Sequence, residues 1–166
     1  MKLHAAIVAA VISLFASMSM AADKVPETCS AGITVSAEEA MKIFQGNIAA
    51  MQAKALPSAM PVLIVDPRKP SDYEKGHIPG AVSLPIEEGQ FTKDALTAAA
   101  GGNSAKPMMF YCNGENCPRS HMACEQAAKF GFTGKISYFY TGIGVNGWPR
   151  VNGPLVQGPK PYPTMP

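Results

Sequence analysis

The chain has 166 residues, of which 47% are hydrophobic and 16% are charged. This length and composition are those of one globular domain with a single buried core, and they exclude a disordered or fibrous protein. The formal net charge is only +2, and the basic residues are scattered along the chain. We therefore expect no interaction with nucleic acid, which requires a concentrated basic surface.

The first 21 residues have the pattern of a cleavable signal peptide. Lys2 is followed by an apolar run over residues 5–16 and by a small-residue segment over 19–21 that offers a cleavage site. The apolar run is shorter than the roughly 20 residues of a membrane-spanning helix, so an uncleaved anchor is the less favoured alternative. We expect an exported, periplasmic protein with no stable membrane insertion after processing.

The mature chain divides into three predicted parts: an amino-terminal arm over residues 22–32, one domain over 33–156 and a proline-rich tail over 157–166. From Pro149 onward, six of eighteen residues are proline, which predicts an extended segment without regular helix. We expect this segment to be a strap or a frayed end, with docking to a partner as the alternative.

The first predicted elements alternate between strand and helix. A β-branched run over 33–35 predicts a strand, and Ser36 with Glu39 forms a capping box that begins a helix. The continuous apolar run over 62–65 predicts a strand buried on both faces, as in parallel sheets. A second capping box, between the serine and the glutamate of segment 71–74, predicts another helix.

The second half of the domain continues this alternation. We expect further strands over 81–84, 108–111 and 136–140, and helices over 92–100 and from Pro118 to Gly131. Strands that alternate with helices imply right-handed crossover connections. The predicted fold is therefore α/β, with a mostly parallel central sheet and helices on both faces.

Cys112 directly follows the predicted strand over 108–111, at the edge of the sheet where the ligand sites of parallel sheets lie. The backbone N–H groups of the next loop and of the following helix create a positive potential, which lowers the pKa of a thiol and favours the thiolate. Arg119 adds a fixed cation for an anionic substrate or intermediate. Cys112 is therefore the candidate reactive residue.

Residues spread over most of the chain form a recognisable pattern. They are Val65 to Arg68, Asp72, Tyr73, Gly76 to Ala81, Tyr111, Cys112, Arg119, Ser120, Gly131, Phe132, Gly142, Ile143 and Trp148. This pattern resembles the signature of rhodanese-like domains, and the resemblance extends over roughly residues 33–156. It implies a rhodanese-like α/β fold.

The resemblance also implies a sulfurtransferase in which Cys112 carries sulfur. Its thiolate would attack a sulfane sulfur donor such as thiosulfate, form a persulfide and pass the sulfur to a thiophilic acceptor. The catalytic candidates are Cys112, Arg119 and Cys117. The residues expected to bind substrate, with loop N–H groups around the persulfide anion, are Asn113, Gly114, Glu115, Asn116 and Ser120. No metal or organic cofactor is required, and the partner is a small sulfur-containing anion or a protein thiol.

The loop after Cys112 is longer than in the familiar family pattern. Six residues separate Cys112 from Arg119, and the additional length brings in Cys117. Three roles are open for Cys117: a resolving thiol that attacks a Cys112 persulfide or pairs with Cys112, a structural disulfide partner, or an inert loop residue. The alternative function is a non-catalytic or dithiol redox module that serves one exported partner protein.

The remaining cysteines, a zinc site and phosphatase chemistry have weaker support in the sequence. Cys124 lies among alanines of a predicted helix and is expected to pack in the core, whereas the role of Cys29 is open, with pairing to Cys124 or to a partner as possibilities. A zinc site that combines His121 with the three cysteines from 112 to 124 lacks the short two-residue spacing of zinc motifs. Phosphatase chemistry would require a general acid that does not stand out in this sequence.

Four other residues of the family pattern are expected to have structural roles. The resemblance points to turn-stabilising hydrogen bonds for His77 and to a core salt bridge or a supporting position beside the site for Asp66 and Arg68. Trp148 is the only tryptophan of the chain. We expect it in the core.

Overall fold

The computed structural model describes residues 25–162, so the predicted signal peptide over 1–21 and residues 163–166 lie outside the described part. The strands are β1 (Ile33–Thr34), β2 (Leu63–Asp66), β3 (Val82–Ser83), β4 (Met108–Tyr111) and β5 (Ile136–Phe139). The α-helices are α1 (Ala37–Gln52), α2 (Pro70–Lys75), α3 (Lys93–Ala99) and α4 (Arg119–Lys129). Two short 3₁₀ helices are η1 (Pro57–Ala59) and η2 (Trp148–Val151).

The five strands form one sheet in the order β1-β5-β4-β2-β3, and every neighbouring pair is parallel. In the centre, β4 aligns Met108 with Leu63 of β2 and with Ile136 of β5. All residues of β2, β4 and β5 are buried, as in a sheet that is covered on both faces. The prediction of buried parallel strands in these three segments is confirmed.

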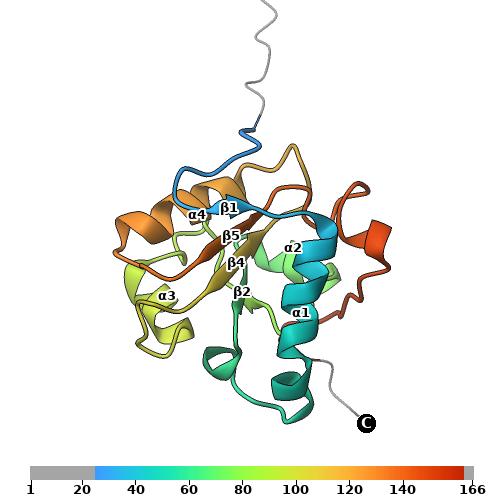
Figure 1. Ribbon diagram of the computed structural model, residues 1–166, viewed down its shortest axis with the longest axis horizontal. Coiled ribbons are helices and arrows are strands. Elements are labelled where there is room, and N and C mark those ends of the chain that lie inside the picture. The colour runs from blue at the N-terminus through green and yellow to red at the C-terminus, as the bar shows by residue number, and fades with distance from the viewer. Residues whose placement is uncertain (1–24, 163–166) are drawn as a thin grey trace, which may run out of the picture.

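Two hydrophobic clusters lie on opposite faces of the sheet, and Figure 1 shows α1 and α2 on one side of the strands and α3 and α4 on the other. On one face, Phe44 of α1 and Tyr73 of α2 pack in the same cluster as Trp148, which is fully buried as expected. On the other face, Leu96 of α3 and Ala123 of α4 belong to the second cluster. The predicted α/β fold, with helices on both faces of a parallel sheet, is therefore confirmed.

The two predicted capping boxes have different outcomes. At α1, the backbone N–H of Glu39 donates a hydrogen bond to the Ser36 hydroxyl at 3.2 Å, and the backbone N–H of Ser36 donates one to the Glu39 carboxylate at 2.8 Å. This prediction is confirmed. At α2 the prediction is wrong, because the helix begins at Pro70, after Lys69, without a side-chain cap. Proline has a helical φ and no N–H to satisfy, so the helix begins one residue before Ser71.

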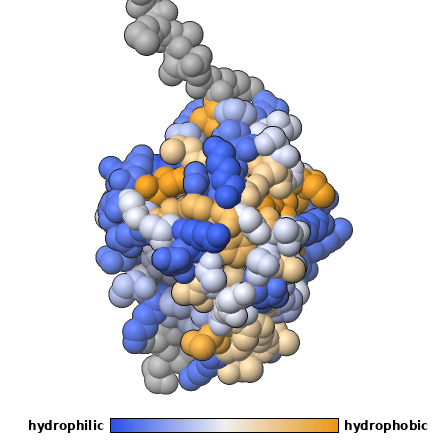
Figure 2. Space-filling model, turned by 90° about the vertical axis from the view of Figure 1, so that its left-hand side faces the viewer, coloured by the Kyte–Doolittle hydropathy of each residue, from blue (hydrophilic) through white to orange (hydrophobic). Residues whose placement is uncertain are grey.

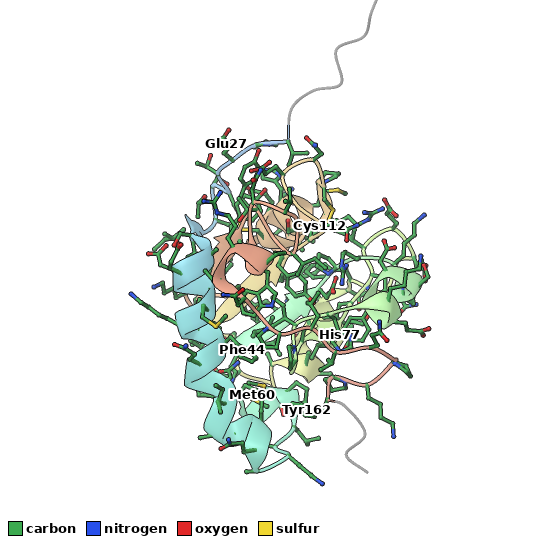
Figure 3. The ribbon with its side chains drawn as sticks, turned by 90° about the vertical axis from the view of Figure 1, so that its right-hand side faces the viewer. Glu27, Phe44, Met60, His77, Cys112 and Tyr162 are labelled. Carbon is green, nitrogen blue, oxygen red and sulfur yellow. A yellow bond between two sulfur atoms is a disulfide. The ribbon has the colours of Figure 1, made fainter. Side chains whose placement is uncertain are left out.

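The proline-rich end of the chain forms one short turn and then lies as a strap across the domain. η2 is a single 3₁₀ turn with a proline near its start, so the expectation of a fully extended segment is wrong there. Farther on, Val156 pairs in antiparallel fashion with His77. The Tyr162 hydroxyl donates a hydrogen bond to the carbonyl of Ala55 at 2.9 Å. Figure 3 shows Tyr162 close to Met60, near the carboxyl end of α1.

A disulfide between Cys29 and Cys124 ties the amino-terminal arm to α4. The two Cα atoms are 6.4 Å apart, although the residues are 95 positions apart in the sequence. Beside this bond, Ser30 donates hydrogen bonds to the carboxylate of Glu125 from its backbone nitrogen at 2.6 Å and from its hydroxyl at 2.7 Å. Cys124 is fully buried in the core, as expected, and its bond to the arm is one of the pairings that were left open for Cys29.

Much of the described surface is polar. On the face that Figure 2 shows, hydrophobic residues lie in small separate groups among hydrophilic ones. Within residues 25–162, the structure contains no helix that is both long and apolar enough to cross a bilayer.

Candidate active site

Cys112 lies at the carboxyl end of the central strand β4, where the chain enters a loop of six residues before α4. A second loop, which follows β5, packs against this position. The backbone N–H of Ile143 donates a hydrogen bond to the carbonyl of Cys112 at 2.9 Å. At Gly142 a Cβ atom would lie 2.1 Å from that carbonyl oxygen, and the backbone is left-handed with a φ of 49°. Only glycine fits there, so the close contact between the two loops depends on it.

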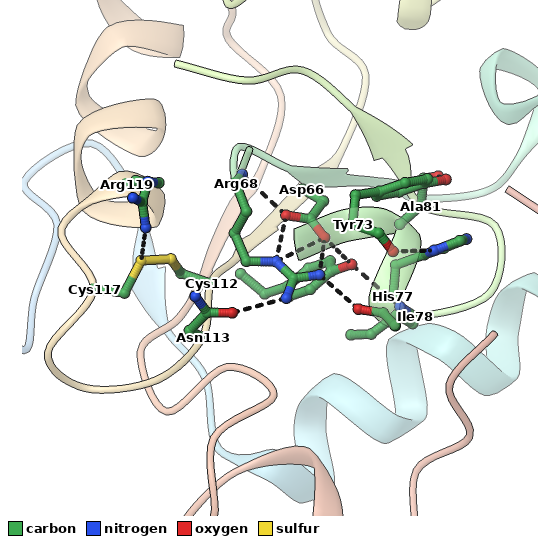
Figure 4. Close-up of polar contacts among 12 residues, drawn as sticks. Asp66, Arg68, Tyr73, His77, Ile78, Ala81, Cys112, Asn113, Cys117 and Arg119 are labelled. Carbon is green, nitrogen blue, oxygen red and sulfur yellow. Dashed lines mark hydrogen bonds and ion pairs between the residues drawn. A yellow bond between two sulfur atoms is a disulfide. The ribbon is translucent and has the colours of Figure 1, made fainter. Parts of the chain in front are cut away.

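Cys112 is bonded to Cys117 across the first loop (Figure 4). Their Cα atoms are 6.0 Å apart. The backbone N–H of Cys117 donates a hydrogen bond to the carbonyl of Gly114 at 2.9 Å, and this turn brings the two cysteines together. The bond excludes an inert role for Cys117, whereas a resolving role and a structural role both agree with it.

Arg119, the first residue of α4, lies between Cys117 and a carboxylate. One guanidinium nitrogen is 3.5 Å from the sulfur of Cys117, and another donates a hydrogen bond to Glu87 at 2.9 Å. The hydrogen bond from Arg119 lowers the pKa of Glu87, so this carboxyl group is ionised at neutral pH and offsets the cation. The sequence indicated Arg119 but not Glu87, because no local pattern marks a residue 32 positions away as its partner.

A buried network connects the core to the first residue of the loop (Figure 4). Arg68 donates hydrogen bonds to the Asp66 carboxylate at 2.6 and 2.8 Å and to the side-chain oxygen of Asn113 at 2.8 Å. The Tyr111 hydroxyl donates one to Asp66 at 2.6 Å. Burial, together with the charge of Asp66, raises the pKa of Tyr111 well above its ordinary value, so its hydroxyl stays a donor. The predicted salt bridge between Asp66 and Arg68 is confirmed, and it holds Asn113 in place.

His77 stabilises two segments, the turn before β3 and the strap near the end of the chain. Its ring nitrogens lie 2.9 Å from the carbonyl oxygen of Tyr73 and 3.0 Å from that of Lys160, and its ring stacks on the ring of Tyr73. Burial lowers the pKa of His77. The predicted structural role of this histidine is confirmed.

A pocket of about 480 Å³ opens between the two loops. The residues that line it from the first loop and the start of α4 are Asn113, Gly114, Glu115, Asn116, Cys117, Pro118 and Arg119. Those from the second loop are Thr141, Gly144, Val145 and Asn146. Asn146 donates hydrogen bonds to the carboxylate of Glu115 at 3.2 and 3.3 Å, and so connects the two sides.

Most of the predicted site residues come together at this pocket. Cys112 and Ser120 differ from the others, since both are fully buried and neither lines the pocket. Gly142 and Ile143 of the second loop belong to the family pattern in the sequence, but the lining residues Thr141, Gly144, Val145 and Asn146 were not predicted as site residues. A signal was present, because this loop follows the carboxyl end of the strand next to β4, and sites of parallel sheets form at that edge.

The start of α4 gives the site a positive potential. Its N-cap residue is Pro118, which forms no side-chain hydrogen bond to the first turn. The N–H groups of this turn therefore add to the charge of Arg119 close to the two cysteines. Such an environment favours a thiolate once the disulfide is reduced.

The described part of the chain contains no group of side chains that fits the zinc hypothesis. Among residues 25–162, no three side chains of histidine, cysteine, aspartate or glutamate are grouped to hold a metal ion. His121, which that hypothesis required, lies 3.9 Å from Glu125. The cysteines are paired in disulfides, whereas zinc binds the thiolate form.

A comparison with protein-family models identifies the family of the chain. The family model of the rhodanese-like domain matches residues 49–148. Among curated proteins, no sequence matches the chain. A solved thiosulfate sulfurtransferase from Pseudomonas aeruginosa is similar at 20% identity with a TM-score of 0.54, and the match covers 76% of this chain but only 20% of that protein.

Two further solved structures are similar over most of their own length. A protein of unknown function from Rhodopseudomonas palustris, described as a possible tyrosine phosphatase, shares 28% identity with a TM-score of 0.52, over 76% of this chain and 86% of that one. A protein from Bacillus halodurans shares 23% identity with a TM-score of 0.50, over 74% and 87% of the two chains. The family match extends over more than half of the sequence, and the parallel sheet and the cysteine loop after β4 agree with it. The chain belongs to the rhodanese-like domain family.

Proposed function

We propose that the protein, in its reduced form, is a sulfurtransferase that carries sulfane sulfur on Cys112. The observation that carries this proposal is the position of Cys112 at the end of β4, in a loop that leads into the N-terminus of α4. Family membership supports the same type of reaction. Arg119, beside the loop, supplies a cation for an anionic sulfur species.

The reaction has two halves. In the first, the Cys112 thiolate attacks the outer sulfur of a donor such as thiosulfate, the S–S bond of the donor breaks, and sulfite leaves with the electron pair. In the second, an acceptor thiolate attacks the outer sulfur of the persulfide, and Cys112 leaves as a thiolate. The N–H groups of the loop and of the first turn of α4 stabilise the negative charge on sulfur in both halves.

The disulfide has to be opened before this chemistry begins. Two electrons and two protons convert Cys112 and Cys117 into thiols. The Cys117 thiolate can later attack Cys112 of the persulfide, which releases hydrosulfide and forms the disulfide again. The oxidised protein is then an inactive state that a reductant reverses.

The same disulfide favours a second candidate function, a dithiol redox module that serves one exported partner protein. Cys112 and Cys117 then exchange two electrons with the thiols of the partner, and no sulfur atom is transferred. The leader-like segment over 1–21 supports export, and a periplasmic location would supply the oxidising conditions in which disulfides persist. The partner is a small sulfur-containing anion for the first function and a protein thiol for the second.

Intact-mass spectrometry tests the proposal. The protein is reduced with a phosphine, freed of the reductant and incubated with thiosulfate. We expect the mass to increase by one sulfur atom with release of sulfite, in the wild type and in Cys117→Ser but not in Cys112→Ser. If the wild type gains no sulfur and only forms its disulfide again, the sulfurtransferase is overturned and the redox module is left. Hydrolysis of an aryl phosphate, measured alongside, tests the activity that the description of the Rhodopseudomonas protein suggests.

A further inference from the structure

Both cysteines of the disulfide between Cys112 and Cys117 are buried, but of the two only Cys117 contributes to the lining of the pocket. Cys117 lines the pocket and is 7% exposed, whereas Cys112 is 0% exposed and lies away from the pocket lining. The second loop covers Cys112, with Ile143 hydrogen-bonded to its carbonyl. Because a thiolate opens a disulfide by direct attack on one sulfur, a thiol that enters the pocket reaches Cys117.

The charge of Arg119 acts on the same sulfur. Its guanidinium lies 3.5 Å from the sulfur of Cys117 and attracts an incoming thiolate. The same cation would also stabilise Cys117 as a leaving thiolate if Cys112 were attacked, but in the oxidised protein Cys112 is buried and does not line the pocket. Accessibility therefore decides which sulfur reacts.

The lining of the pocket indicates what kind of molecule brings the thiol. Two of the lining residues are charged, and both have partners: Glu115 accepts hydrogen bonds from Asn146, and Arg119 donates one to Glu87. The other lining side chains carry no charge, and Val145 is a hydrophobic residue that is 81% exposed. In the oxidised protein, a pocket with internally paired charges and an exposed valine suits an uncharged polypeptide segment.

We propose that this pocket receives a cysteine on an uncharged segment of a partner dithiol protein, and that the partner's thiolate attacks Cys117. A bond forms between the partner's sulfur and Cys117, the bond to Cys112 breaks, and its electron pair leaves on Cys112. The partner's second thiolate then attacks its own neighbouring sulfur, which forms the partner's disulfide and releases Cys117 as a thiolate that takes up a proton. The partner is oxidised by two electrons and this protein is reduced by two.

This order of events adds a step of regulation to the proposed function, and the inference rests on that function. Cys112 is released first, while Cys117 is still blocked by the partner. During that interval Cys117 cannot attack Cys112 and form the disulfide again. The residue proposed to carry sulfur thus becomes a free thiolate under the control of the partner.

A mapping experiment identifies the attacked sulfur. The oxidised protein is mixed briefly with an equimolar uncharged synthetic peptide that contains one cysteine and several valines and serines. The reaction is stopped with acid, the released thiol is alkylated after denaturation, and the fragments are sequenced by mass spectrometry. We expect the peptide on Cys117 and the alkyl group on Cys112. The opposite arrangement, or an equal mixture, overturns the proposal.

A matched pair of variants tests the docking surface. Val145→Asp places a charge at the pocket, and Leu56→Asp places the same charge at a residue that is 72% exposed and outside the pocket. With the uncharged peptide we expect Val145→Asp to slow mixed-disulfide formation about threefold, and with a version flanked by two aspartates about tenfold, while Leu56→Asp changes neither rate. Equal rates in the two variants overturn the docking surface.

The two proposals fail in different ways. Uptake of sulfur from thiosulfate by phosphine-reduced protein does not involve the partner, so it is measured separately in the wild type and in Val145→Asp. If sulfur uptake is absent but the peptide still bonds to Cys117, the sulfurtransferase is wrong and the order of exchange stands. If sulfur uptake is normal but the peptide bonds to Cys112, the order of exchange is wrong and the sulfurtransferase stands.

Discussion

The disulfide of the amino-terminal arm and the disulfide of the pocket differ in the length of chain that they close and in their surroundings. The bond from Cys29 to Cys124 joins residues 95 positions apart, and the bond from Cys112 to Cys117 joins residues five positions apart. Cross-linking a long loop removes far more conformational freedom from the unfolded chain than cross-linking a short one. The first bond therefore mainly stabilises the fold, and the second is placed where a change in its oxidation state affects a pocket.

A carboxylate accompanies each bond and shows the same contrast. Glu125 accepts hydrogen bonds from Ser30, the residue after Cys29, and so fixes the arm. Glu87 accepts a hydrogen bond from Arg119, which also contacts the sulfur of Cys117. One carboxylate fixes the arm, whereas the other pairs with the cation beside Cys117 at the candidate site. Each of these differences can be tested by substitution.

The largest expected effect distinguishes the two bonds by their role in the reaction with thiosulfate. In phosphine-reduced protein, Cys112→Ser should lower the rate of sulfite release from thiosulfate by at least about a thousandfold, as when a nucleophile is removed. Removing the arm disulfide with Cys29→Ala and Cys124→Ala should leave that rate within about twofold, measured at a temperature where both proteins are folded. A large loss in the arm variant would show that the two bonds are not separate in function.

The next effect distinguishes the two disulfides by their contributions to the free energy of unfolding. In the chain-entropy treatment, the arm disulfide contributes about 4.7 kcal/mol to the free energy of unfolding and the pocket disulfide about 2.2 kcal/mol. Urea denaturation of two double variants, Cys29→Ala with Cys124→Ala and Cys112→Ala with Cys117→Ala, should therefore show the larger loss for the arm. Equal losses would contradict the assignment of the arm bond as the main structural bond.

A smaller effect concerns the charge at the pocket. Glu87→Gln removes a negative charge and frees Arg119, so reduced protein should react with thiosulfate about three to ten times faster. Glu88→Gln, at the neighbouring position, is the matched control and should change the rate little. If both variants react alike, Glu87 does not restrain Arg119.

The Glu87 carboxylate also determines how the stability of the fold should change with pH. Its hydrogen bond from Arg119 lowers the pKa of Glu87 below 4.5. The stability that this ion pair contributes is present above pH 4.5 and is lost as the pH falls through the lowered pKa, because only then does the folded protein bind the proton. Urea denaturation between pH 3 and pH 6 should show a weaker decline for Glu87→Gln than for the wild type.

The smallest effect concerns the arm. Hydrogen bonds from Ser30 lower the pKa of Glu125 below 4.5, so the unfolded chain binds more protons than the folded one in the window below that value. Stability should fall as the pH is lowered through this window, and less so in Glu125→Gln. Thermal melting at pH 3.5 and pH 6 measures the difference, and an unchanged pH dependence in the variant would show that the arm is held by the disulfide alone.

Local patterns in the sequence predicted the parts of the fold that depend on neighbouring residues. The apolar run over 108–111 placed β4 correctly, and Cys112 followed as the residue at its end. The Ser36 cap was also correct. The second capping box failed for a local reason as well, since the helix begins at Pro70, two residues earlier than a Ser71 cap would place its start.

The parts that could not be predicted depend on distant segments. Nothing near Cys29 in the sequence indicates that α4 passes beside it, and Glu87 meets Arg119 only after β3 and α4 have taken their places. The burial of Ser120 likewise follows from the way α4 packs on the sheet. Short-range patterns contain no information on such contacts, because the folded topology creates them.

The pairing of the four cysteines is nested, since the bond from Cys112 to Cys117 lies within the loop that Cys29 and Cys124 close. Along the chain, Cys112 and Cys117 lie between Cys29 and Cys124, so pairing the cysteines in sequence order would give the wrong bonds. A loop of five residues closes sooner than one of about ninety. Rapid closure of the small ring would keep Cys112 and Cys117 from pairing with Cys29, and Cys29 would stay free to pair with Cys124. The bond of the pocket would thus also guide the correct formation of the arm disulfide.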